Sequence, residues 1–121
     1  YTLDWPMDDQ PAWIKTRQGH LLSLPYPHEV NDIPMIMLHH GDAGAFADMI
    51  IDNFDEMMEQ AEKQPLVYCI SLHAFIVGQP FRLRHLRRAL SHICQQRDKI
   101  WIATGGEIAA YFAEAAPVGP E

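Results

Sequence analysis

The chain has 121 residues, a formal net charge of −7 and an isoelectric point of about 5.4. That length suits one ordinary domain, whereas a complete barrel of strand–helix units needs roughly 250 residues. The acidic balance argues against a nucleic-acid-binding protein, because phosphate recognition depends on clustered Lys and Arg. The arginines that do cluster lie in one expected helix and are interpreted as a solvated face: Arg82, Arg84, Arg87 and Arg88.

The sequence also predicts the cellular compartment of the protein. No apolar run approaches the roughly 18 residues that a membrane-spanning helix needs, and no secretion signal is visible. Cys69 and Cys94 fit no metal or redox spacing, so we expect buried thiols in a reducing compartment. We therefore expect a cytoplasmic protein with no membrane or nucleic-acid partner. The loop-like opening without Met is typical of a piece of a longer protein.

The first third of the chain predicts little regular structure. Residues 1–19 are rich in Asp, Pro and Trp without a sustained period, and we expect a loop. A short strand is expected at Leu21–Leu24, closed by the prolines at positions 25 and 27. A second irregular stretch is expected from Tyr26 to about Gly41.

The clearest helix follows this stretch. Apolar side chains recur at helical spacing from Phe46 to Ala61, and acidic side chains fall mostly on the other face. Asp42 is suited to be the N-cap, and Pro65 stops the helix from continuing.

Two further strand–helix pairs are expected downstream. Leu66–Leu72 is a nearly continuous apolar run, as in parallel strands that are covered on both faces. A loop at residues 78–80 precedes a helix whose apolar stripe runs from Leu83 to Cys94. The second strand is expected at Ile100–Ala103.

The last helix should begin after Thr104, because Thr104 and Glu107 have the spacing of a capping box. We expect this helix to bury Ile108, Tyr111 and Phe112. Strands that alternate with helices predict an α/β fold with parallel strands and right-handed crossovers.

His73 is the first candidate for chemistry, because it follows the apolar run directly. In α/β folds a polar residue at the carboxyl end of a buried strand lies where ligands bind. An imidazole suits proton transfer, since its ordinary pKa is near neutral pH. A core histidine bonded to a neighbouring carbonyl fits the residues alone equally well.

Several blocks, taken in order, resemble the polysaccharide-deacetylase superfamily, and most closely its allantoinase-like branch of purine catabolism. They are Asp4-Trp5-Pro6, Asp8 to Trp13, Leu24 to Pro27 with Glu29 and Asn31 to Pro34, Cys69 to Arg82, and Trp101 to Ile108. The resemblance implies that residues 1–121 are the C-terminal part of a distorted (β/α) barrel. It also implies a single deacetylase-like domain whose N-terminal half, with the metal site and the general base, is absent.

The activity implied by the resemblance is hydrolysis of a non-peptide C–N bond by a deacetylase or allantoinase-like amidohydrolase. The chain alone is expected to be inactive. His73 matches the general acid that protonates the leaving nitrogen, although Ala74 stands where carbohydrate deacetylases have Pro. Candidate substrate contacts are Asp9, Trp13, Glu29, Asn31 and Asp32. The substrate would be a small amide or ureide, or an N-acetylated sugar.

Other interpretations of these residues stay open. Asp and Asn pairs are common in turns, where their side chains bond their own backbone, and Trp13 can pack between loops. No cofactor is expected in this chain, and a divalent metal, zinc, would lie in the missing half. His39 and His40 are expected to be loop histidines and not metal ligands, because adjacent side chains diverge.

Two other functional classes also remain. The chain can be a noncatalytic remnant that binds a ligand or partner, or a complete small α/β domain with a chance likeness. Half a barrel leaves open strand edges, which favour pairing with another chain. We therefore expect either a homo-oligomer or dependence on the missing half.

Overall fold

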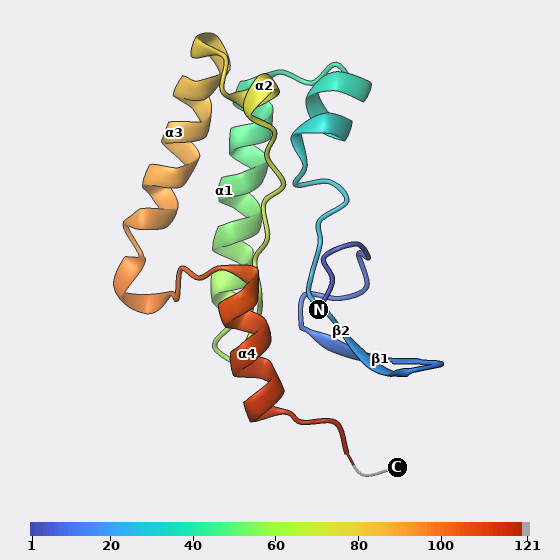
Figure 1. Ribbon diagram of the computed structural model, residues 1–121. Coiled ribbons are helices and arrows are strands. Elements are labelled where there is room, and N and C mark those ends of the chain that lie inside the picture. The colour runs from blue at the N-terminus through green and yellow to red at the C-terminus, as the bar shows by residue number, and fades with distance from the viewer. Residues whose placement is uncertain (120–121) are drawn as a thin grey trace.

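Helices form most of the regular structure, and α1 (Ala43–Gln60) lies at the centre of the chain (Figure 1). The structure, a computed structural model, describes residues 1–119. In chain order the elements are β1 (Ala12–Thr16), β2 (Gly19–Ser23), the π-helical η1 (Ile33–Leu38), α1, α2 (Ala74–Val77), α3 (Pro80–Cys94), the 3₁₀ turn η2 (Arg97–Lys99) and α4 (Gly105–Ala115). None of the helices of residues 1–119 is long and apolar enough to cross a membrane.

The predicted central helix is confirmed. The Asp42 carboxylate accepts a hydrogen bond from the Ala45 N–H at 2.8 Å, which satisfies a donor that the first turn of α1 leaves free. One face of α1 packs against α3 and forms the main core, whose buried residues are Val30, Ile36, Phe46, Ala47, Ile50, Ile76, Val77, Leu86 and Ala89. Each large apolar side chain buried there contributes roughly 1.5–3 kcal/mol.

The expectation of a loop over residues 1–19 is wrong at its end. Ala12–Thr16 forms β1, which pairs antiparallel with β2 and sets Trp13 opposite Leu22. Gly19 closes the turn with a φ of +121°, a conformation that only glycine adopts freely. The strand expected at Leu21–Leu24 is confirmed as β2, which begins at Gly19.

The stretch from Tyr26 to Gly41 is also more regular than expected. Ile33–Leu38 forms η1, with Pro34 in its first turn, where a missing N–H costs nothing. The Asn31 side-chain oxygen accepts from the Ile33 N–H at 3.1 Å and holds the start of this turn. The sequence pattern missed η1 because all six of its residues are apolar, so no alternation between an apolar and a polar face marks a helical period.

The two expected parallel strands are extended but do not form a sheet. Leu66–Leu72 makes one parallel bridge, between Asn31 and Ser71, and Ile100–Ala103 makes none among residues 1–119. A strand is defined by its partner, and the described residues place no strand beside these segments. Burial on both faces, expected for Leu66–Leu72, is wrong, since residues 66–71 are only half-buried and Leu72 is 38% exposed. In the second segment Trp101 is 59% exposed and Ile102 62% exposed.

The helices α3 and α4 lie where they were expected, with less burial. On α3 the buried residues are Leu86 and Ala89, whereas Cys94 is exposed, so the expectation of a buried thiol there is wrong. The capping box of α4 is confirmed: the Thr104 hydroxyl accepts from the Glu107 N–H and the Glu107 carboxylate accepts from the Thr104 N–H. Tyr111 is largely exposed, against expectation.

A minor core joins the hairpin to α4. Its buried residues are Leu22, Leu24 and Ala109, and Leu3, Trp13, Ile108 and Phe112 pack around them. It shares no residue with the main core. The chain is therefore organised around two separate apolar clusters.

Candidate functional site

The site centres on a pair between His73 and Asp32, residues 41 positions apart in the chain. The His73 backbone N–H donates to Asp32 Oδ2 at 2.7 Å, and His73 Nδ1 lies 2.7 Å from Asp32 Oδ1. One carboxylate thus holds both the backbone and the ring of the same histidine. With the proton on Nδ1, the second ring nitrogen, Nε2, is left to act on a substrate.

Backbone hydrogen bonds bring the two residues together. The Ser71 N–H donates to the Val30 carbonyl at 3.0 Å, and the Asp32 N–H donates to the Ser71 carbonyl at 3.2 Å. These two bonds flank Asn31 and form the parallel bridge between the two segments. His73 then lies two residues beyond Ser71, and it forms the N-cap of α2.

Burial differs sharply between the two partners. The Asp32 side chain has no exposed surface, whereas the His73 side chain is 33% exposed. A carboxylate removed from water must be paired, and here both of its oxygens have a donor. The Asp32 carboxylate thus holds the His73 ring on its Nδ1 side, while the His73 side chain stays partly exposed. The Asp32 side chain has no exposed surface for direct contact with a substrate.

An aromatic side chain adjoins the exposed imidazole. The ring of Phe75 lies edge-on to the His73 ring, with centroids 5.7 Å apart, and is 67% exposed. Sequence analysis did not single out Phe75. Its position two residues after a candidate acid is the only signal that the sequence offers.

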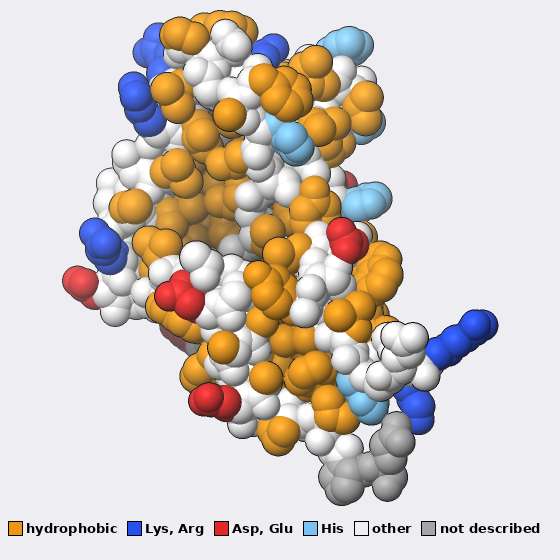
Figure 2. All heavy atoms as spheres, in the orientation of Figure 1, with side chains coloured by type: hydrophobic (Ala, Val, Ile, Leu, Met, Phe, Trp, Pro, Cys, Tyr) orange, Lys and Arg blue, Asp and Glu red, His pale blue; other side chains and the backbone are white. Residues whose placement is uncertain are grey.

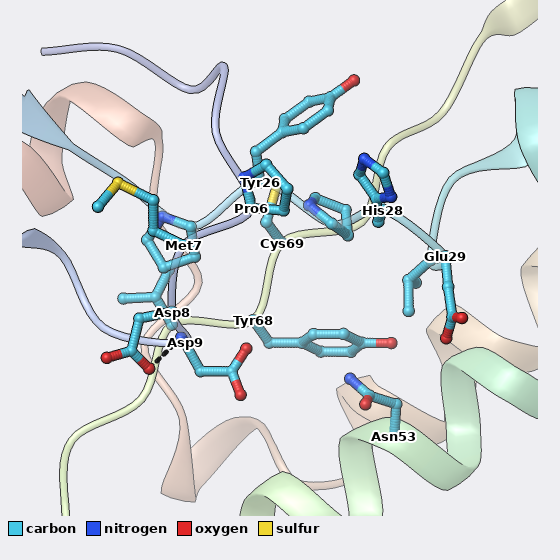
Figure 3. A pocket seen from close by; sticks show the side chains of 14 residues that line it. Pro6, Met7, Asp8, Asp9, Tyr26, His28, Glu29, Asn53, Tyr68 and Cys69 are labelled. Atoms are coloured by element: carbon cyan, nitrogen blue, oxygen red, sulfur yellow. Dashed lines mark hydrogen bonds between the residues drawn. The ribbon is translucent and has the colours of Figure 1, made fainter.

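A hollow of about 410 Å³ lies between the N-terminal loop, the loop after β2 and the Leu66–Leu72 segment (Figure 3). Asp8 and Asp9 lie on one side of it and Glu29 on the other, with the Tyr68 ring reaching toward Asn53 between them. Two predicted substrate contacts, Asp9 and Glu29, therefore line a common space. His73 is not among the described residues that line it.

The groups at the floor of this hollow are held neutral. The pKa of the Tyr68 phenol is raised to about 12, chiefly by burial; a hydrogen bond with Asn53 lowers it, and the neighbouring Cys69 adds a smaller increase. The Tyr68 hydroxyl donates to the Ile50 carbonyl at 3.0 Å. Burial also raises the pKa of the Cys69 thiol. Neither group is thereby prepared to act as a nucleophile or base at neutral pH.

The remaining predicted contacts lie elsewhere. Trp13 packs against Phe112, with ring centroids 6.5 Å apart, and its indole N–H donates to the Ala116 carbonyl at 2.7 Å. Trp13 therefore belongs to the minor core, and the structure does not bring it to the His73–Asp32 pair. Asn31 adjoins the pair, but its side chain contacts Ile33 and Tyr26. A substrate contact by Asp9, Trp13, Glu29 or Asn31 stays a prediction.

No metal centre is assembled by the residues that the structure describes. Within residues 1–119, no three His, Cys, Asp or Glu side chains lie close enough to hold an ion. His39 and His40 are exposed at the end of η1, and His40 has a positive φ of 53°. These residues do not fit the divalent metal that the sequence resemblance implies.

Comparison with known proteins supplies the family. No protein-family model matches the chain. A Schizosaccharomyces pombe protein named as a polysaccharide deacetylase is 30% identical, over 91% of this chain and 38% of its own length. A solved structure from Pseudomonas aeruginosa PAO1, named as a polysaccharide deacetylase, is 28% identical with a TM-score of 0.86. The match covers 97% of this chain and 40% of that structure's chain.

A solved allantoinase is also similar, with a TM-score of 0.88 and 25% identity. It matches 97% of this chain, which covers 39% of it. The chain thus spans about two-fifths of the length of the relatives that it matches. In both sequence and fold, the chain belongs to the polysaccharide-deacetylase superfamily.

Proposed function

We propose that this chain supplies the acid–base histidine of a hydrolase that cleaves a non-peptide C–N bond, as a deacetylase or an allantoinase-like amidohydrolase. One observation carries the proposal: the buried Asp32 carboxylate binds both the backbone N–H and Nδ1 of His73 and leaves the other side of the ring accessible. A histidine that is only structural has no need for a partner that fixes its orientation twice.

In the proposed reaction His73 acts when the tetrahedral intermediate collapses. Its imidazolium donates the Nε2 proton to the leaving nitrogen, the C–N bond breaks, and the carbonyl forms again. Asp32 stabilises the imidazolium and keeps Nε2 directed at the leaving group. Phe75 excludes water on one side of the ring.

The rest of the machinery belongs, in this proposal, to polypeptide beyond the chain. Residues 1–121 form the C-terminal portion of one deacetylase-like domain, and the general base and a divalent metal, zinc, lie in the N-terminal portion. When bound, such a metal polarises the carbonyl that is attacked. Within residues 1–119, no group of His, Cys, Asp or Glu side chains could hold such an ion. The chain alone is inactive on this account.

We favour a small amide or ureide as substrate over an N-acetylated sugar. Asp9 and Glu29 line opposite sides of one hollow, where their carboxylates can accept hydrogen bonds from the N–H groups of a compact ligand, although His73 does not line this hollow. Ala74 stands where the carbohydrate-type motif has Pro. We place the protein in the cytoplasm, because Cys69 and Cys94 are both free thiols.

The second candidate is a noncatalytic remnant that binds a ligand or partner through the same loops. The observation in its favour is that the hollow lined by Asp9 and Glu29 does not include His73 among its lining residues. Activity of the complete protein separates the two candidates.

The experiment compares the complete protein that carries this chain with its His73→Gln variant. We expect hydrolysis of allantoin or a related ureide, and a loss of about a hundredfold or more in kcat with little change in KM. Phe81→Leu, at an exposed site outside the pair, serves as the control. Near-normal kcat in His73→Gln would remove the catalytic assignment. Turnover of an acetylated oligosaccharide alone would overturn the substrate preference.

A further inference from the structure

Asn31 is buried, and its polar groups are engaged within the chain. The sequence predicts it as a substrate contact, yet the residue is only 9% exposed. Its backbone N–H donates to the Glu29 carbonyl at 2.7 Å, and its carbonyl accepts from the Met35 N–H at 3.2 Å. Its side-chain oxygen accepts from the Ile33 N–H at 3.1 Å, and its side-chain nitrogen donates to the Tyr26 hydroxyl at 3.4 Å. Each of these four groups therefore has a partner other than a substrate.

The bond to the Ile33 N–H closes a turn around Asp32. A side-chain oxygen that accepts from the backbone N–H two residues further on forms an Asx turn, which restrains the residue between them. That residue is Asp32, and its own backbone N–H donates to the Ser71 carbonyl at 3.2 Å. The backbone of Asp32 is thus held by the Asn31 side chain and by the bridge to Ser71.

The orientation of the His73 ring depends on where the Asp32 carboxylate lies. Within residues 1–119, the only hydrogen bond of the ring is the one to Asp32 Oδ1. Figure 2 shows hydrophobic side chains gathered at the end of the molecule that carries η1 and α2, and the exposed ones include Met37, Leu38 and Phe75. Such side chains cannot replace a lost hydrogen bond to the ring. A displaced Asp32 would therefore leave the ring free to turn.

A neutral amide suits position 31 better than a carboxylate. The Asn31 amide accepts from Ile33 and donates to Tyr26, whereas a carboxylate can only accept. The amide also places no second negative charge beside the buried Asp32 carboxylate, where two like charges would disfavour each other. Asn31 thus fixes Asp32 without competing with it for the proton of His73.

We propose that Asn31 is a positioning residue, which fixes Asp32 so that Asp32 can hold the His73 ring, and that it does not contact the substrate. This inference rests on the proposed function, because it gives Asn31 a part in the reaction of His73. A substrate contact has a different kinetic effect. Loss of a contact that is made equally in the ground and transition states raises KM, whereas a misplaced acid lowers kcat.

The test compares variants of the complete protein that carries this chain, with allantoin as substrate. Asn31→Ala removes the acceptor of the Ile33 N–H, so kcat should fall about tenfold or more while KM changes by less than about twofold. Asn31→Ser keeps an oxygen that can close the same turn, and it should recover most of the loss. These two variants separate the turn from the rest of the side chain.

A second measurement needs no turnover. The nitrogen chemical shifts of the His73 ring should show the neutral ring with its proton on Nδ1 in the unaltered protein and in Asn31→Ser. In Asn31→Ala that preference should be lost. Near-normal kcat in His73→Gln would remove the catalytic assignment, but the tautomer would still decide whether Asn31 fixes the pair.

Thr16→Val is the matched control. The Thr16 hydroxyl accepts from the Gln18 N–H at 3.2 Å and donates to the Gly19 carbonyl at 2.9 Å, so it closes a similar turn in the hairpin. Its removal should leave kcat, KM and the His73 tautomer unchanged. An equal loss of kcat in Thr16→Val and Asn31→Ala would contradict the proposal, because it would reflect a general loss of structure.

Three further results would overturn the proposal. A KM raised about tenfold in Asn31→Ala with kcat unchanged would identify a substrate contact. An Nδ1 proton retained in Asn31→Ala would show that Asn31 does not act on the pair. Failure of both Asn31 variants to fold would make Asn31 a residue of the fold as a whole. If only Asn31→Ala fails to fold, an Nδ1 proton in Asn31→Ser supports the proposal and its loss there contradicts it.

Discussion

The two cores of the chain stabilise different parts of the structure. The main core buries nine residues from α1, α2, α3, η1 and the segment before η1, and its Val30 and Ile76 lie close in sequence to Asp32 and His73. The minor core buries three residues between the hairpin and α4, and it holds Trp13. The larger cluster can therefore hold the His73–Asp32 pair in place, whereas the smaller one attaches the hairpin to α4. Trp13 and His73, which the sequence placed in one site, belong to different cores.

The largest effect should come from shortening a fully buried side chain in each core. Ile50→Ala in the main core and Leu24→Ala in the minor core should each cost about 2–5 kcal/mol, because each leaves a cavity. In Leu24→Ala, amides of the hairpin and α4 should exchange faster while those of α1 and α3 stay slow. Equal acceleration throughout would mean that the two cores unfold as one unit.

Next in size is Asp32→Asn, which should lower the free energy of unfolding by about 1–3 kcal/mol, because a buried acceptor of two hydrogen bonds is replaced by a group that cannot satisfy both. The matched control is Asp55→Asn. Asp55 makes an equally short contact with His92, at 2.7 Å, but on the surface, where such a pair contributes only about 0–1 kcal/mol. Equal losses in the two variants, measured by urea unfolding, would contradict the role of burial.

A smaller effect is expected at the start of α4. Thr104→Ala removes the N-cap acceptor and should cost about 1 kcal/mol, whereas Thr104→Ser should restore most of it. The loss should appear as faster amide exchange in α4, with α3 unchanged. If α3 exchanges faster to the same extent, the cap supports more than the minor core.

The smallest effect concerns pH. Hydrogen bonds from the Thr104 backbone and hydroxyl lower the pKa of Glu107 below its ordinary value. A carboxylate whose pKa is lower in the folded state adds stability above its unfolded pKa, and this is lost as the pH falls through the folded value. The helicity of α4 should therefore decline in acid, below about pH 4.5. Glu107→Gln should flatten that decline, and an unchanged profile would contradict the capping-box explanation.

Local signals in the sequence predicted local structure well. The structure confirms three such signals: the Asp42 cap, the Thr104–Glu107 spacing and the apolar stripe of α1. Each of them acts within a single helix. The extended conformation of Leu66–Leu72 was also predicted. The sequence did not predict that, within residues 1–119, this segment pairs with another segment through a single bridge. Pairing depends on a second strand, and no pattern within a segment reveals whether its partner is present.

The candidate site was predicted only in part, for the same reason. His73 was found from its place after an apolar run, whereas Asp32 was predicted as a substrate contact and not as the partner of His73. Their contact spans 41 residues and depends on the bridge between Asn31 and Ser71. Trp13 was grouped with them through its sequence block, yet its indole N–H is bound to Ala116. Long-range pairing, and not residue type, decides which candidates meet.

The most direct test of the His73–Asp32 pair is the tautomer of the His73 ring, read from its nitrogen chemical shifts by NMR on residues 1–121. Contact with the Asp32 carboxylate should hold the neutral ring with its proton on Nδ1, and Asp32→Asn should abolish that preference. Exposed His28 provides the unpaired reference within the same spectrum. A His73 ring with its proton on Nε2, or one unaffected by Asp32→Asn, would contradict the account.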